Sequence, residues 1–174
     1  NSAPEASIRL LDMGMDPFNF ADALIGILAQ RLAKRLCGKC KEAYTPGPDE
    51  LRQFMTEYTS ELRANDAWKK DPQGEAKKLY EYWIKEYAKD GKLQFYKTKG
   101  CENCGGSGYK GRCGLHELMI ASDAIKKMIQ EKARVADLFI KCVEEGMSTL
   151  KMDGMDKVMM GLTDMAQVRA VCIK

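Results

Sequence analysis

Two Cys-x-x-Cys pairs are the residues of this 174-residue chain best suited to chemistry. In Cys37-Gly-Lys-Cys40 and in Cys101-Glu-Asn-Cys104, the two-residue spacing lets both thiolates point at one ion. Two such pairs complete a tetrahedral four-cysteine site, the usual arrangement for structural zinc, with no position left for a reacting water. The sequence therefore predicts a structural zinc site formed by Cys37, Cys40, Cys101 and Cys104.

The separation of the two pairs is the main departure from this pattern. Residues 41–100 lie between them, whereas the pairs of a compact zinc ribbon are about 15–20 residues apart. Two amphipathic helices are expected within this segment, and a hairpin of helices returns the chain to its starting point. We therefore expect an insertion over about residues 45–92 whose ends meet at the metal site.

Three other interpretations of the cysteines stay open at the level of sequence. Cys101, Cys104, Cys113 and His116 could bind zinc without the first pair, in a C-x2-C-x8-C-x2-H arrangement. The four thiols could also be core residues, or one pair could be redox-active, although no thioredoxin-like βαβ pattern surrounds either.

The remaining polar and sulfur-containing residues favour structural roles. Cys113, Cys142 and Cys172 are expected to be packing residues. His116 and Glu117 would make an acid–base pair, but neighbours on a strand face opposite ways, so a structural or surface role is expected. A series of methionines at helical spacing indicates core packing rather than an adaptable binding groove: Met147, Met152, Met155, Met159, Met160 and Met165.

Composition excludes several functional classes. Apolar residues make up 45% and charged residues 30%, as in an ordinary globular chain, and no apolar run is long enough to span a membrane. The net charge of +3 is too small to imply a nucleic acid or membrane partner by itself. A basic cluster of Arg31, Lys34, Arg35, Lys39 and Lys41 could bind phosphate groups or form a solvated helix end near thiolates.

Catalytic motifs are missing, and the cysteine count indicates a reducing compartment. The sequence contains no Walker A motif, no G-x-G-x-x-G and no H-E-x-x-H. Seven cysteines in a chain large enough to bury a core favour ligands and core thiols over disulfides. The first residue is Asn rather than Met, so we expect a processed chain or a fragment.

The expected fold is mainly α with a small β element beside the cysteines, in the α+β class. Periodicity and capping residues predict helices over residues 3–13, 16–36, 51–62 and 76–87, joined in the middle by a loop over residues 65–74. Short strands are expected at residues 93–97 and 113–119, with glycine-rich turns over residues 100–114. Four further helices are expected to begin at residues 122–123, 135, 150 and 164.

The order of these motifs resembles the C-terminal region of bacterial traffic ATPases, which power type II secretion and type IV pilus assembly. The segments that carry the resemblance are QRLAKRLCGKCKEAY at residues 30–44, GCENCGGSGYKGR at 100–112 and GLHEL at 114–118. Upstream, IRLLDMGMDPF at residues 8–18 resembles the segment after that family's histidine box. The insertion is the part of the chain outside the resemblance.

The resemblance implies a parent protein with a RecA-like ATPase core. Residues 1–36 would be the last helices of that core, residues 37–113 the tetracysteine zinc module with its insertion, and residues 114–174 a C-terminal helical subdomain. ATP and Mg²⁺ would bind only elsewhere in the parent, so the chain itself is expected not to hydrolyse ATP.

The resemblance also implies partners and a location. The parent would be a cytoplasmic homo-hexamer, peripheral to the bacterial inner membrane, that drives a membrane platform protein of the secretion or pilus machinery. The alternative is a zinc-dependent module that binds nucleic acid or protein, and its nucleic-acid form would need a continuous basic face.

Overall fold

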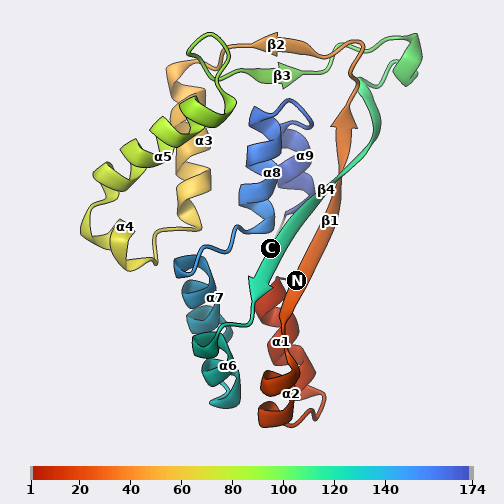
Figure 1. Cartoon of the computed structure of the whole chain (residues 1–174). Coiled ribbons are helices and arrows are strands. Elements are labelled where there is room, and N and C mark those ends of the chain that lie inside the picture. The colour runs from red at the N-terminus through yellow and green to blue at the C-terminus, as the bar shows by residue number, and fades with distance from the viewer. Residues whose placement is uncertain (1, 173–174) are drawn as a thin grey trace.

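The computed structural model describes residues 2–172, which form helices and two two-stranded antiparallel sheets, with the β1–β4 pair along one side of the molecule (Figure 1). The helices are α1 (Ala3–Asp12), α2 (Pro17–Ala23), α3 (Pro48–Ser60), α4 (Asp66–Lys70), α5 (Pro72–Tyr87), the 3-10 turn η1 (Glu102–Cys104), α6 (Asp123–Gln130), α7 (Val135–Glu144), α8 (Leu150–Met159) and α9 (Met165–Val171). The strands are β1 (Gly26–Leu36), β2 (Glu42–Tyr44), β3 (Phe95–Lys97) and β4 (Tyr109–Ile120). This is the predicted α+β class.

The expected helix over residues 16–36 is wrong beyond Ala23. Gly26–Leu36 instead form β1, which pairs antiparallel with β4 over nearly its whole length. The apolar residues of this segment also fit a helical spacing. That local spacing cannot reveal the pairing, because the partner strand is distant in sequence. Gly26 suits the close pairing, since a Cβ there would lie 2.7 Å from the carbonyl oxygen of Met119.

Two smaller expectations also need correction. The segment 100–114 is not all turn, because β4 begins at Tyr109. The loop expected over residues 65–74 contains α4 and the first turn of α5. Glycine and polar residues are common in turns, but they also occur in paired strands and at the starts of short helices, as in these two segments.

Several predicted helix starts are confirmed by their capping residues. Ser2 and Glu5 form the expected capping box at α1, in which each side chain accepts a hydrogen bond from the other residue's backbone N–H. Asp16, Ser122 and Asp164 cap α2, α6 and α9 through their side-chain oxygens.

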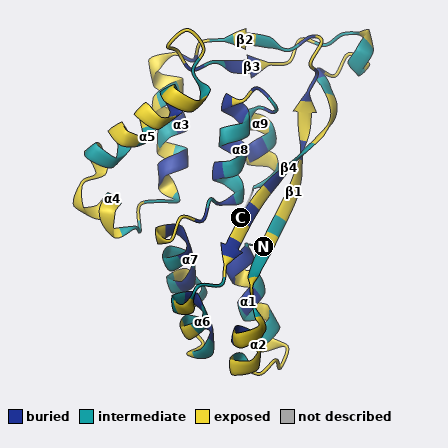
Figure 2. Ribbon diagram, viewed as in Figure 1, coloured by how far each residue is buried: buried dark blue, intermediate teal, exposed yellow. Residues whose placement is uncertain are grey.

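Two buried clusters hold the chain together (Figure 2). The insertion cluster joins α3, α5 and β3 to α8 and α9, and its buried members are Phe54, Tyr58, Trp83, Leu93, Phe95, Met152, Met155, Val158, Met159 and Val168. The base cluster joins α1, α2, α6 and α7 to β4, and its buried members are Ala3, Ala21, Met119, Ile125, Ile129, Leu138, Cys142, Val143 and Met147. Four of the six methionines expected in the core are buried, Met165 is half-buried and Met160 is exposed.

Glu117 is a buried carboxylate that ties α1 and α8 to β4. One of its oxygens accepts the backbone N–H of Ala3 at 2.7 Å, and the other accepts that of Leu150 at 3.1 Å. Both donors are the first residues of their helices, where backbone N–H groups have no partner within the helix. Glu117 is therefore structural, and exposed His116 faces the other side of the strand, as the alternation predicts.

Among residues 2–172, no helix has both the length and the apolar character needed to cross a membrane.

Candidate metal centre

Two strand pairings bring the cysteine pairs together from opposite sides of the insertion. Cys37 directly follows β1 and Cys40 shortly precedes β2, while Cys101 follows β3 and Cys104 precedes β4. Since β1 pairs with β4 and β2 pairs with β3, the two turns between the sheets must meet. The pairing of β2 with β3 also closes the base of the insertion. The length of the insertion therefore does not change how the two cysteine turns meet.

Each turn is fixed by backbone hydrogen bonds and by glycine. The N–H of Cys37 donates to the Gly108 carbonyl at 2.9 Å, which joins the two turns directly, and the N–H of Gly106 donates to the Cys101 carbonyl at 2.9 Å. Gly108 has φ of +78°, and a Cβ there would lie 2.4 Å from the Thr98 side chain. Glycine therefore meets both a conformational and a steric need at this residue.

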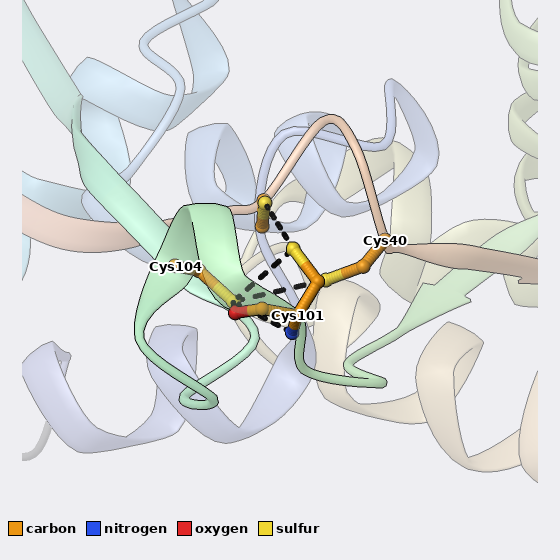
Figure 3. Close-up of side chains that lie close together, drawn as sticks. Cys40, Cys101 and Cys104 are labelled. Carbon is orange, nitrogen blue, oxygen red and sulfur yellow. Dashed lines mark hydrogen bonds between the residues drawn. The ribbon is translucent and has the colours of Figure 1, made fainter.

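The four sulfur atoms lie within 4.8 Å of one another. The Sγ–Sγ distances are 3.9 Å for Cys37–Cys101, 3.9 Å for Cys40–Cys104 and 3.8 Å for Cys101–Cys104, and Figure 3 shows the Cys40, Cys101 and Cys104 side chains converging. In a tetrahedral site with Zn–S bonds of about 2.3 Å, neighbouring sulfurs lie about 3.8 Å apart. A disulfide needs about 2.05 Å, so the spacing fits thiolates around an ion.

Backbone N–H groups point at the sulfurs and favour the thiolate form at two of the four positions. The N–H groups of Cys101 and Gly108 each donate to Cys104 Sγ at 3.2 Å. Burial opposes ionisation, but these donors lower the pKa of Cys104 to about 6. The backbone N–H of Lys39 likewise lowers the pKa of Cys37. Removal from water raises the pKa of Cys40 to about 11.

The rival set of Cys101, Cys104, Cys113 and His116 does not come together in the part of the chain that the structure describes. The group of possible metal ligands found there contains the four cysteines of the two pairs, and Cys113 and His116 are not part of it. His116 lies on the exposed face of β4, with its Nε2 3.2 Å from the Gln30 side-chain nitrogen. Cys113 is half-buried, and burial raises its pKa.

The other two thiols also lie apart from the centre. Cys142 is buried in the base cluster, as predicted, and burial raises the pKa of its thiol to about 12. Cys172 packs against the insertion cluster.

A second set of contacts joins the centre and the insertion to the C-terminal part of the chain, and sequence reasoning did not find it. Lys41, a member of the basic cluster, donates from Nζ to the Gly161 carbonyl at 2.6 Å and lies over the Tyr96 ring. Glu57 of α3 receives two hydrogen bonds from Arg169 of α9. These residues are far apart in sequence and match no motif, so only the fold could reveal the contacts.

Comparison with known proteins places these features in one family. The family model for type II/IV secretion system proteins matches residues 1–170. This chain belongs to that family. It is 35% identical over 174 residues to the type IV pilus assembly ATPase PilB of Thermus thermophilus, covering 100% of the chain and 16% of the relative. It is 32% identical over 171 residues to the type II secretion system ATPase E of Vibrio cholerae, covering 98% and 28%.

A third relative matches the chain to a similar extent. The PilB of Pseudomonas aeruginosa is 30% identical over 171 residues, covering 98% of the chain and 25% of the relative. The chain thus corresponds to between a sixth and somewhat more than a quarter of the length of these relatives. The family resemblance expected from the sequence is confirmed.

Proposed function

We propose that this chain is the zinc-binding and helical C-terminal part of an ATPase that powers protein secretion or pilus assembly. The observation that carries the proposal is the coincidence of a whole-chain family match with four thiols at the spacing of a tetrahedral zinc site. The metal would be bound by Cys37, Cys40, Cys101 and Cys104, which leave no open position, so its role is structural. ATP and Mg²⁺ would bind elsewhere in the parent protein.

The parent would be a cytoplasmic homo-hexamer at the bacterial inner membrane, acting on a platform protein of the secretion or pilus machinery. Residues 1–36 would continue its RecA-like core, residues 37–113 would form the zinc module, and residues 114–174 the C-terminal subdomain. Zinc would contribute folding free energy where two three-residue strands alone form few hydrogen bonds. The module would hold the insertion at a fixed orientation, so that it moves with the core or docks a partner.

Metal content tests the centre directly. Elemental analysis of the chain is expected to give one zinc per chain, and Cys37→Ser is expected to lose it. Cys113→Ser is the matched control and should keep zinc. If Cys37→Ser retained stoichiometric zinc and Cys113→Ser lost it, the set that includes His116 would be the correct one.

The role in the ATPase needs a parent protein that contains this chain. Removing zinc with EDTA is expected to lower both the ATPase rate and the proportion of hexamer. An unchanged rate and an intact hexamer would limit zinc to local scaffolding. Salt-sensitive binding of the chain to random DNA would instead support the nucleic-acid alternative.

A further inference from the structure

The pairing of β1 with β4 places two cations directly opposite each other. Lys34 and Arg112 are register partners and both are exposed. Like charges in this arrangement destabilise a strand pair unless an anion lies between them. Within residues 2–172, neither side chain forms an ion pair with Asp or Glu, although Glu42 and Glu57 each bind two cations elsewhere.

The two cations border a shallow depression of about 270 Å³ near the end of the ribbon that carries the cysteine centre. Its other lining residues are Ser107, Tyr109 and Gly111. The Nζ atom of Lys34 lies 5.9 Å from the centre of the Tyr109 ring, which forms one wall. Gly111 has open space where a side chain would be, so a ligand can approach the backbone there.

The acidic residue beside this depression is already engaged. One oxygen of Asp164 accepts the Tyr109 hydroxyl at 2.5 Å, and the other accepts the backbone N–H of Gln167 at 3.0 Å. Burial and the neighbouring Asp164 raise the pKa of Tyr109 to about 12, so its hydroxyl keeps its proton and remains the donor. Asp164 is thus committed to Tyr109 and to the start of α9 rather than to the two cations.

We infer that Lys34 and Arg112 form a binding site for a phosphate group. Two cations match the charge of about −2 on a phosphate monoester better than the single charge of a carboxylate. The Arg112 guanidinium can donate two parallel hydrogen bonds to phosphate oxygens, while Lys34 acts as a point charge. The depression is smaller than the roughly 300–1,000 Å³ of whole-ligand pockets, so it fits one phosphate group of a larger molecule or a small phosphate compound.

Titration of the ¹⁵N-labelled chain with inorganic phosphate and with pyrophosphate tests the site. Saturable amide shifts are expected at Lys34, Ser107 and Arg112. The double variant Lys34→Gln/Arg112→Gln is expected to weaken binding about tenfold or more, because hydrogen bonds to charged groups are lost. Lys70→Gln/Lys85→Gln is the control, since it removes two exposed lysines of α4 and α5 and leaves this site unchanged.

Absence of saturable shifts, or equal weakening in both double variants, would overturn the site. Flotation with phosphatidylglycerol vesicles, against phosphatidylcholine vesicles, distinguishes a lipid headgroup from a soluble phosphate compound. Flotation that disappears in Lys34→Gln/Arg112→Gln assigns a headgroup, and pyrophosphate binding without flotation assigns a soluble source. Flotation that survives in this variant would overturn the headgroup assignment.

Discussion

The insertion cluster and the base cluster lie towards opposite ends of the long β1–β4 ribbon and are stabilised differently (Figure 1). The base cluster is largely aliphatic, and three of its four helices have side-chain caps, at Ser2, Asp16 and Ser122. The insertion cluster is rich in aromatic rings, includes two three-residue strands and adjoins four converging thiols.

The two regions therefore differ in what stabilises them. Apolar burial alone can stabilise the base region, because its helices are regular and its side chains fill one core. In the insertion region, the ends of a long segment must also be held together, and short strands give few hydrogen bonds for this purpose. A metal bound by the four thiols would add to the closure that the strand pairing gives, so the two regions should respond differently to the same perturbation.

The largest effect is expected from loss of a thiol ligand. Cys40→Ser should destabilise the insertion region by on the order of 5 kcal/mol, because structural zinc sites bind with roughly 10 kcal/mol of free energy. Hydrogen exchange would follow amides of β2 and β3 against those of α6 and α7. Equal loss of protection in both regions would contradict the distinction.

The next effect tests whether the aromatic packing is independent of the metal. Trp83 is fully buried and packs edge-on against Phe54 and Tyr58, with ring centroids 5.4 and 5.0 Å away. Trp83→Ala should cost about 3–5 kcal/mol by urea unfolding yet leave one zinc per chain. Leu138→Ala in the base cluster is the matched change, with an expected cost of about 2–5 kcal/mol. Loss of zinc in Trp83→Ala would show that the metal site depends on the aromatic packing of the insertion cluster.

A titratable group in the insertion region predicts pH dependence. Asp156 of α8 is largely buried beside Asp153, and burial followed by this neighbour raises its pKa to about 7, despite Tyr58 and Lys157. A carboxyl whose pKa is higher when folded binds its proton more tightly in that state, so stability falls as pH rises towards 7. Asp156→Asn should therefore be more stable than the parent sequence at pH 8, by about 1–2 kcal/mol.

Urea unfolding of both proteins at pH 5 and pH 8 measures this difference. The advantage of Asp156→Asn should shrink at pH 5, where the folded protein keeps Asp156 protonated. An advantage of the same size at both pH values would show that ionisation is not its cause.

The smallest effect concerns the ion pair between α3 and α9. Hydrogen bonds from Arg169 lower the pKa of Glu57, so this contribution is present above the ordinary carboxyl pKa and is lost as pH falls through the lowered value. Since Arg169 is half-exposed, Glu57→Gln should cost only about 1 kcal/mol at pH 7. Glu81→Gln, which removes one exposed contact to Lys77, should cost less than about 0.5 kcal/mol. Equal costs by urea unfolding would show that the ion pair between Glu57 and Arg169 contributes no more to stability than an exposed contact.

The candidate centre could be predicted from sequence because its signal is local. Each Cys-x-x-Cys pair defines a turn within four residues, and Gly108 indicates the tight backbone beside it. The convergence of the two pairs depended on a further prediction, that an insertion of helices returns to its base. Strand pairing achieves this closure, so the conclusion was correct although part of its structural reason was missing.

The fold was predictable where local rules decide it and not where distant pairing does. Helix starts at Ser2, Asp16 and Ser122 follow from capping chemistry within one turn. β1 was missed because Leu28, Leu32 and Leu36 also fit a helical period, and nothing near them indicates a partner beyond residue 108. Ion pairs such as Glu57–Arg169 leave no pattern in the sequence at all.

The buried carboxylate of Glu117 gives the molecule a short mechanical path from its first helix to its cysteine centre. A pull on the start of α1 acts on one carboxylate oxygen, and the other oxygen holds the start of α8. Helix α8 carries the displacement over about 15 Å, as ten helical residues do. Beyond its end, the Gly161 carbonyl holds Lys41, next to Cys40. One side chain, one helix and one lysine therefore make a continuous series of contacts from the start of α1 to the turn that holds Cys40.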